Sequence, residues 1–356
     1  MSGRRLLAIA AASMALLCGC REKPTAKPEA PNQPKAEASN ATPKPDWASA
    51  VKARDKGDYT TAFKEFMALA QQGNTNAEVE VGSMYNDGDG VVQNYTEAVR
   101  WFLAAAEQGD CAGQYSLANM YLQGHGVPQD MNQAAQWYIK AANQKEGASQ
   151  RLAANNLGVL YRDGTGVAKD TQAALKWFRV AADQGVSDAQ CSLGAMYANG
   201  LGVEQNLDTA KQWYEKAAEQ ANVGAQITLG RMYTVGEGVI EDQAQGARWY
   251  MLAAEQGDAI AQYRYAMAFK LGAGVRRDDV QAYMWLSLAA KEAGPYPDLA
   301  AHHVSAEDVA DFLRRFRESM TQAQIDEASR LAQEWNPKKE VYDHQTGVWL
   351  LVQKAK

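Results

Sequence analysis

The chain repeats one unit of about 36 residues, and this repetition constrains its fold more than any other feature. A tryptophan marks each copy, and consecutive tryptophans are 36, 40, 36, 36 and 36 residues apart, at Trp101, Trp137, Trp177, Trp213, Trp249 and Trp285. A fixed period of about 20–50 residues is typical of solenoids, in which each unit buries its apolar face only against its neighbours. We therefore expect one extended array.

Each copy has the pattern of a helix, a glycine-rich turn and a second helix. In the copy at 224–258, Ala225, Leu229, Gly230, Met232 and Tyr233 fall on one side of a 3.6-residue helix. Small residues on such a stripe allow a neighbouring helix to approach closely. The same offsets return in the other copies, so every copy is predicted to begin with an amphipathic helix.

The turn carries the signature G-x-G-V, as in Gly236 and Gly238. Two glycines at this spacing are typical of a helix that ends through positive φ. An N-cap residue stands seven positions before every tryptophan, at Asn94, Asp130, Asp170, Asn206, Asp242 and Asp278. An aromatic residue or Leu follows each tryptophan, and an alanine pair, such as Ala253-Ala254, comes after it. These alanines predict the point of closest contact between the two helices.

The pattern A…LG..Y..G.GV..D...A..W...AA..G resembles the Sel-one-like repeat, a relative of the tetratricopeptide repeat, over six copies from about residue 76 to residue 294. Four extra residues interrupt the register around Asn143–Asn156. The resemblance implies an all-α fold, a right-handed superhelical solenoid of stacked antiparallel helix hairpins (α/α). It also implies partner binding on a concave face lined by the first helices.

The N-terminal residues predict export and lipidation. Arg4 and Arg5 precede a short apolar run that ends in Leu17-Cys18-Gly19-Cys20. This run is too short for a typical transmembrane span and is typical of a secretory signal. Its ending resembles a bacterial lipobox, which would make Cys20 the acylated first residue; an ordinary signal peptide with a chance cysteine is the alternative. Arg21 follows Cys20, and by resemblance to the sorting rule of enteric bacteria this favours the periplasm-facing outer membrane over the inner membrane.

A proline-rich segment separates the signal from the array. Residues 21–46 contain six of the ten prolines and little to bury, which indicates a flexible tether. Residues 46–356 carry 29 basic and 39 acidic side chains, a balance that disfavours nucleic-acid binding. We therefore expect a signal peptide (1–19), a lipidated cysteine and tether (20–46), a repeat array (47–294) and a C-terminal helical cap and tail (295–356).

Irregular segments are predicted to close both ends of the array. Trp47–Gly73 is typical of a seventh hairpin without G-x-G-V, with Phe66 in the place of the tryptophan. Two capping boxes, beginning at Ser305 and Thr321, predict helices at about 306–319 and 322–335. The apolar run Val348–Val352 could form either a strand or a short helix.

No catalytic or metal-binding pattern emerges from the sequence. His125 lies in a turn and His302, His303 and His344 lie beyond the array, without the spacing of metal ligands. No HExxH, GxSxG or Walker sequence is present. Cys111 and Cys191 are two copies apart and are not expected to form a disulfide. We expect no cofactor, no metal and no enzymatic activity.

The remaining candidate is a surface on the first helices. Each first helix carries the repeated tyrosine, for example Tyr233, and the residues two before and two after it lie opposite the apolar stripe. The polar residues at these positions are predicted to contact a partner: Asn119, Gln123, Asp163, Asn199 and Arg231. Solubility alone is the alternative role for each of them. The favoured function is a monomeric scaffold or regulator of the bacterial cell envelope that binds a protein or peptide and touches the membrane only through its lipid. The alternative is an envelope protein that binds peptidoglycan or β-lactam with hydrolase-like activity.

Overall fold

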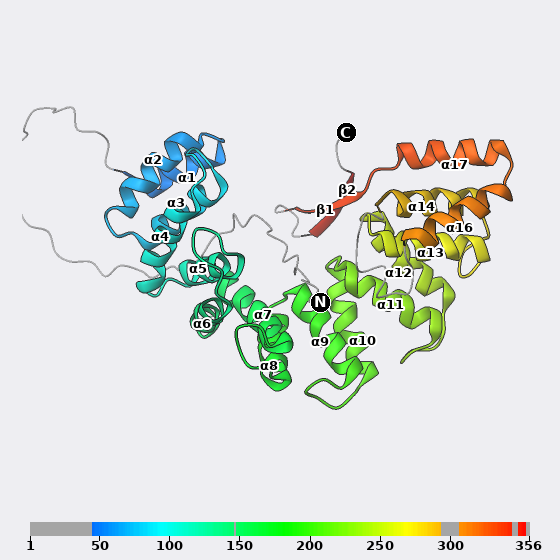
Figure 1. The fold of residues 1–356 in the computed structure, drawn as a ribbon, viewed down its shortest axis with the longest axis horizontal. Coiled ribbons are helices and arrows are strands. Elements are labelled where there is room, and N and C mark those ends of the chain that lie inside the picture. The colour runs from blue at the N-terminus through cyan, green and yellow to red at the C-terminus, as the bar shows by residue number, and fades with distance from the viewer. Residues whose placement is uncertain (1–44, 146, 293–305, 344–347, 354–356) are drawn as a thin grey trace, which may run out of the picture. The chain divides into compact units, whose positions relative to one another are not determined.

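The computed structural model describes residues 45–145, 147–292, 306–343 and 348–353, and these form sixteen α-helices and two β-strands (Figure 1). The first six helices are α1 (Trp47–Asp55), α2 (Tyr59–Ala70), α3 (Thr75–Asp87), α4 (Tyr95–Glu107), α5 (Cys111–Gln123) and α6 (Met131–Ala142). The next four are α7 (Ala148–Asp163), α8 (Thr171–Asp183), α9 (Ser187–Asn199) and α10 (Leu207–Glu219). The last six are α11 (Val223–Val235), α12 (Gln243–Glu255), α13 (Ala259–Leu271), α14 (Asp279–Glu292), α16 (Ala306–Glu318) and α17 (Gln322–Glu334).

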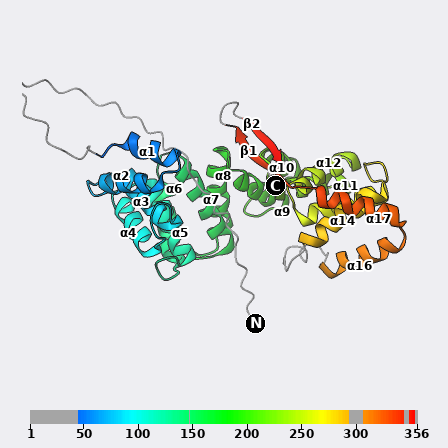
Figure 2. The same cartoon turned by 90° about the horizontal axis from the view of Figure 1, so that it is seen from above.

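The helices form hairpins that stack in chain order, which confirms the predicted all-α solenoid class. Within each of two compact units, two helices joined by a G-x-G turn pack together, and the second helix of one hairpin packs against the first helix of the next (Figures 1 and 2). The contacts divide the chain into two compact units with a boundary inside α7. The first unit contains α1–α6 and the second contains α8–α17.

The helix ends follow the predicted local signals. Five of the predicted N-cap side chains accept hydrogen bonds from backbone N–H groups of their own first turn, in α4, α6, α8, α10 and α12. Asp278 does the same for the N–H groups of Val280 and Gln281, at 2.9 and 3.0 Å. Gly236 ends α11 in the left-handed region with φ of 70°. The sequence therefore determines these boundaries locally.

In the core of the hairpin, the aromatic residue that follows the tryptophan packs against the first helix. Tyr214 is 4% exposed, and its ring lies so near Gly194 that a Cβ there would be 2.7 Å from the ring. The same contact joins Phe102 to Gly82, Phe178 to Gly158 and Tyr250 to Gly230. Because glycine leaves a notch in the first helix, the ring can lie flush against the helix backbone.

The tryptophans themselves are, in most repeats, less buried than these rings. Trp101, Trp137, Trp177 and Trp249 are only half-buried, whereas Trp213 and Trp285 are buried. Trp137 packs against residues of α4 and α5, and so lies between its own hairpin and the preceding one. The tryptophan that marks the period in the sequence therefore belongs to the junction between hairpins, and the aromatic residue or Leu that follows it belongs to the hairpin core.

A second close approach of backbones joins neighbouring hairpins at their turns. Gly274, with φ of 73°, lies against the start of α12 in the preceding hairpin. A Cβ on Gly274 would be 2.0 Å from the carbonyl oxygen of Gln243. The second glycine of the turn is therefore required both by its φ and by this contact with the preceding repeat.

A buried glutamine in the first helix forms the polar link between successive hairpins. Its side-chain amide donates to the carbonyl of an alanine eight residues earlier, as Gln226 Nε2 does to Ala218 O at 3.2 Å. The equivalent residues, all at most 6% exposed, are Gln114, Gln150, Gln190 and Gln262. The amide thus satisfies a carbonyl at the end of the preceding helix, which would otherwise be buried without a donor.

The acceptor oxygen of the same glutamine receives a donor from the following turn. Gln256 Nε2 donates to Gln226 Oε1 at 2.9 Å, and Gln220 Nε2 donates to Gln190 Oε1 at 2.7 Å. Gln144 Nε2 makes the same bond to Gln114 Oε1. These glutamines connect three consecutive helices and fix the register of an interface made mostly of alanine.

The first repeat has a glutamate at this position. Glu78 is 5% exposed and both of its carboxylate oxygens accept from Gln108 Nε2, at 3.1 and 2.9 Å. Burial raises the pKa of the Glu78 carboxyl; the Gln108 hydrogen bond opposes this shift and the negative charge of Asp110 adds to it. Unlike glutamine, the ionised carboxylate has no proton to donate to a backbone carbonyl.

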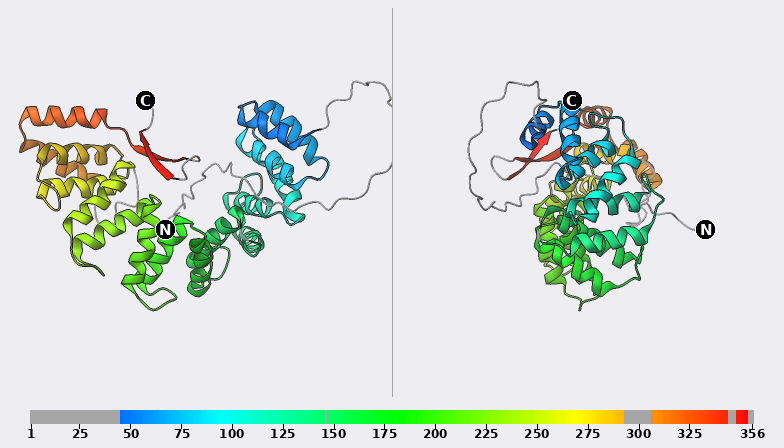
Figure 3. Two further views of the ribbon diagram at one scale, coloured as in Figure 1. Left: turned by 180° about the vertical axis from the view of Figure 1, so that it is seen from behind. Right: turned by 90° about the vertical axis from the view of Figure 1, so that its left-hand side faces the viewer.

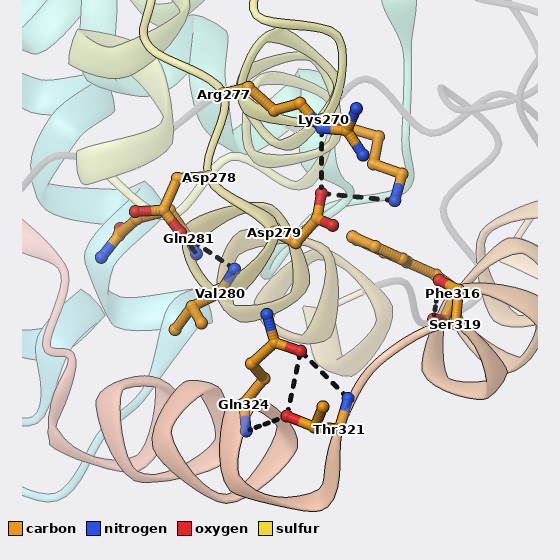
Figure 4. A network of polar contacts seen from close by, with 10 residues as sticks. All are labelled: Lys270, Arg277, Asp278, Asp279, Val280, Gln281, Phe316, Ser319, Thr321 and Gln324. Carbon is orange, nitrogen blue, oxygen red and sulfur yellow. Dashed lines mark hydrogen bonds and ion pairs between the residues drawn. The ribbon is translucent and has the colours of Figure 1, made fainter.

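The C-terminal helices α16 and α17 cover the last repeat. Both pack against α14, as the yellow and orange ribbons in Figure 3 show. Lys270 Nζ lies 3.6 Å from the centre of the Phe316 ring and 3.3 Å from Asp279 Oδ1 (Figure 4). Trp335 meets Trp285 edge-on at 5.8 Å between ring centres. The sixth repeat therefore has a partner for its outer face.

Of the two capping boxes predicted in this region, one is present and the other begins at a residue that the structure does not describe. The capping box at Thr321 and Gln324 is present and begins α17 (Figure 4). The other predicted capping residue, Ser305, lies outside the described residues, as do His302, His303 and His344. The tail forms an antiparallel hairpin of β1 (Lys338–Asp343) and β2 (Val348–Gln353), which selects the strand alternative for the apolar run.

Substitution of neighbouring aromatic residues distinguishes the hairpin core from the junction. Phe178→Ala removes a fully buried ring and should cost about 3–5 kcal/mol. Trp177→Ala removes a half-buried side chain and should cost less than half as much. Hydrogen exchange of α7 and α8, the two helices that Phe178 joins, measures the difference between the variants. Equal loss of protection would contradict this assignment of the two positions.

Glu78→Gln should stabilise the first repeat in a pH-dependent way. The folded pKa of Glu78 is raised, so its ionised form weakens the native state at neutral pH. The variant should melt about 2–4 °C higher at pH 7. The difference should shrink as pH falls toward 4.5, the ordinary pKa of the carboxyl, because wild-type Glu78 is then protonated in the folded protein.

The matched control places the same charge elsewhere. Gln226→Glu creates a buried carboxylate in the fifth repeat and should lower the melting temperature at pH 7, with recovery on acidification. A melting temperature of Glu78→Gln equal to that of wild type at pH 7 would show that burial of the Glu78 charge costs nothing.

Candidate functional site

The candidate surface is formed by first-helix residues that point away from the hairpin core. The last residue of each first helix stands two positions after the repeated tyrosine, which is Phe269 in the sixth repeat. This residue, here called the outer position, is exposed in every repeat. Its residues are Asp87, Gln123, Asp163, Asn199, Val235 and Leu271. They lie just before the glycine turn, so one side chain per repeat is available to a partner without disturbing the stack.

The predicted site residues differ in how freely they can contact a partner. Gln123, Asp163, Asn199 and Arg231 are exposed. Asp163 is held by two hydrogen bonds from the neighbouring Arg162, at 2.8 and 2.9 Å, and Arg231 forms an ion pair with Glu237. Asn199 Nδ2 donates to the Ala195 carbonyl of its own helix. Exposed pairs of this kind contribute little to stability and can be exchanged for contacts with another molecule.

Asn119 has a structural task that its register does not reveal. It is half-buried, and its Oδ1 accepts the hydroxyl proton of Tyr138, which is fully buried. Asn156 Nδ2 donates to the same hydroxyl oxygen at 3.1 Å. Asn119 of repeat 2 and Asn156 of repeat 3 therefore satisfy a buried phenol that repeats with phenylalanine at this position do not contain.

Two residues in the same register were missing from the predicted surface. Met267 and Leu271 occupy, in the sixth repeat, the positions of Arg231 and Val235 in the fifth. Leu271 is 70% exposed and Val235 is 60% exposed, whereas the outer position is polar in the first four repeats. This change from polar to apolar within one register was visible in the sequence and is the signal that would have indicated them.

No group of three His, Cys, Asp or Glu side chains that could hold a metal ion occurs among the described residues. His125 stacks on Tyr95 with 4.4 Å between ring centres. Burial, with a smaller effect from Asp188, raises the pKa of the Cys191 thiol to about 12, so this cysteine is a poor nucleophile at neutral pH. Neither Cys111 nor Cys191 forms a disulfide bond with a described residue.

The part of the chain that the structure describes contains no candidate transmembrane helix. None of its helices combines the length and the apolar character that crossing a bilayer requires.

Stacked helix hairpins are the architecture of α/α solenoid repeat proteins, and this chain has that architecture with one exposed outer position per repeat. The Sel1 repeat model matches six segments, at residues 75–110, 111–146, 151–186, 187–222, 223–258 and 259–293. The chain therefore belongs to the Sel1 repeat family. The gap between the second and third matches contains the four extra residues found in the sequence. Sel1 repeat proteins generally mediate protein–protein interaction and are generally not catalytic.

Two solved structures are similar to this chain along most of its length. One is a protective antigen present in uropathogenic Escherichia coli strains and displaying an SLR fold; it is 34% identical over 76% of this chain, with a TM-score of 0.63. The match takes in 59% of the length of that antigen. The other is a Sel1 repeat protein from Oxalobacter formigenes, 32% identical over 68% of this chain and 98% of its own, also with a TM-score of 0.63. No curated protein matches the chain.

Proposed function

We propose that this chain is a lipid-anchored scaffold of the bacterial cell envelope that binds a protein or peptide through its first helices. The observation that carries the binding role is the row of outer positions, because it repeats in every copy and is exposed in every copy. The membership in a family that mediates protein–protein interaction supports the same role. Repeat proteins commonly use such repeated, regularly spaced surface positions for recognition.

The proposed location depends on the N-terminal sequence. Leu17-Cys18-Gly19-Cys20 is followed by a proline-rich segment long enough to separate a lipidated Cys20 from the first helix. One acyl chain alone gives only marginal, reversible membrane binding, so stable attachment through Cys20 requires more than one anchoring signal. Arg21 rather than Asp follows Cys20, and by resemblance to the sorting rule of enteric bacteria this favours the outer membrane, with the array facing the periplasm.

The binding surface is tested with a four-residue variant and a matched control. Gln123, Asp163, Asn199 and Arg231 are changed together to Ala; Asn119 is left intact because it satisfies Tyr138. Each exposed change should cost less than about 0.5 kcal/mol, so the melting temperature should stay close to that of wild type. Partner recovery after crosslinking in native envelopes should fall at least tenfold, since few residues dominate an interface.

The control carries alanines at exposed second-helix positions of the same repeats, Gln136, Lys176, Gln212 and Arg248. It should recover the partner as wild type does. Recovery unchanged in the first-helix variant, or lost equally in both, would argue against a first-helix surface. Copurification of glycan with no protein in stoichiometric amount would favour the peptidoglycan-binding alternative.

Anchoring is tested separately with Cys20→Ser. This change removes the thiol that would be acylated, so the variant should leave the membrane fraction and lose the mass of its acyl chains. Membrane fractionation with intact-mass measurement follows both effects. Unchanged mass and partitioning would exclude lipidation at Cys20, whatever the array binds.

A further inference from the structure

The fifth and sixth repeats break the pattern of the array at several positions on one surface. The outer position changes from Asp, Gln, Asp and Asn in repeats 1–4 to Val235 and Leu271. Leu271 is 70% exposed and Val235 is 60% exposed. Large apolar side chains at such exposure are not needed for stacking, because the polar residues of the other repeats serve equally well at this position.

A cavity of about 150 Å³, lined in part by Leu271, lies within the second unit. One wall is a single face of α13, where Arg264, Met267, Ala268 and Leu271 are spaced i, i+3, i+4 and i+7. Thr234 of α11 and Tyr250 of α12 also line it. A cavity of roughly 150 Å³ is large enough to hold benzene, so this one suits the side chain of a leucine or phenylalanine.

The one charged side chain among the residues that line this cavity is Arg264, and no other repeat has an arginine at this position. The equivalents of Arg264 are Glu80, Ser116, Asn156, Ser192 and Thr228. Arg264 is half-buried, and it forms no hydrogen bond or ion pair that the structure records with any described residue. Its charge and that of Arg231 both act on the Tyr250 hydroxyl, whose pKa is raised by burial and lowered by these two arginines and by Thr234.

We propose that this cavity binds an extended segment of a protein partner that presents a bulky apolar side chain next to a carboxylate. The apolar side chain fills the space between Met267 and Leu271, and the carboxylate pairs with Arg264. Methionine adapts its shape to such a guest, and a pair of arginine and carboxylate is among the strongest polar contacts at an interface. This inference rests on the proposed function and names the chemistry of the partner at one end of the array.

The alternatives fit the same observations less well. A nucleic acid would place phosphates on Arg264, but the folded region carries more acidic than basic side chains and the cavity is mostly apolar. A small apolar molecule would fill the cavity and leave Arg264 without a partner. An acidic peptide without a large side chain would leave Leu271 exposed. A segment with both groups satisfies all of these residues at once.

The test uses a defined peptide and the full-length chain. The probe is the acetylated and amidated hexapeptide Gly-Asp-Leu-Phe-Asp-Gly, which offers a carboxylate on either side of the apolar pair. Binding is titrated by ligand-observed NMR, with two comparison peptides, one with Asn for both Asp and one with Ala for Leu-Phe. We expect the probe to bind at least tenfold more tightly than either comparison peptide.

Substitutions in the protein then locate the contact. Arg264→Gln and Leu271→Ala should each weaken probe binding at least fivefold, and Arg264→Gln should bind the Asn peptide no more weakly than wild type does. The matched controls Arg248→Gln and Leu201→Ala change exposed residues away from the cavity and should bind the probe as wild type does. Thermal melting of each variant checks that the fold is retained.

Two results would overturn the proposal. The first is no binding of the probe to wild type. The second is that replacing both Asp of the peptide by Asn lowers the affinity by the same factor for wild type and for Arg264→Gln. The second result would mean that the carboxylates act elsewhere. Either failure leaves the broader function open to its own test, because crosslinked partner recovery with the four-residue variant does not involve Arg264 or Leu271.

Discussion

The contact between an aromatic ring of the second helix and a glycine notch of the first helix is the interaction on which the array depends. In four repeats the glycine allows the ring to lie where a Cβ would be 2.7 Å away. This close approach brings the alanine pairs of the second helix into the core, where they are almost completely buried. A larger residue at the notch would separate the two helices and weaken every contact that follows along the hairpin.

The repeats that depart from this contact compensate for it. Repeat 2 has Ala118 at the notch and Tyr138 as the ring, and Asn119 and Asn156 satisfy the buried hydroxyl. Repeat 6 pairs Ala266 with Leu286, both buried, and gains the cap helices α16 and α17 on its outer face. Between hairpins the glutamine links fix the register of the packed helices as well as stabilising them, because two alanine faces alone could shift against each other by one helical turn.

Local signals in the sequence predicted most of the fold. The N-caps, the left-handed glycines and the capping box at Thr321 depend on neighbours within a few residues, so the sequence pattern is enough to locate them. The glutamine links were not predicted, because Gln226 donates to a residue eight positions back and accepts from one thirty positions on. The place of the tryptophans was also unclear, because a periodic large residue marks the repeat whether it fills a hairpin or joins two.

The sequence predicted which side of the first helices is exposed, but not which contacts each exposed residue makes, because those contacts involve residues far away in the sequence. Register follows from helical periodicity, which selects the exposed side of the first helix. The state of each residue depends on residues far away in the sequence: Asn119 accepts a hydrogen bond from Tyr138, whereas Arg264 forms no hydrogen bond or ion pair with any described residue. In an array whose repeats must satisfy the same stacking contacts, most positions are fixed by the stack. Residues that leave the common pattern without serving the stack are therefore the ones able to encode recognition, and Arg264, Val235 and Leu271 meet that condition together on neighbouring repeats.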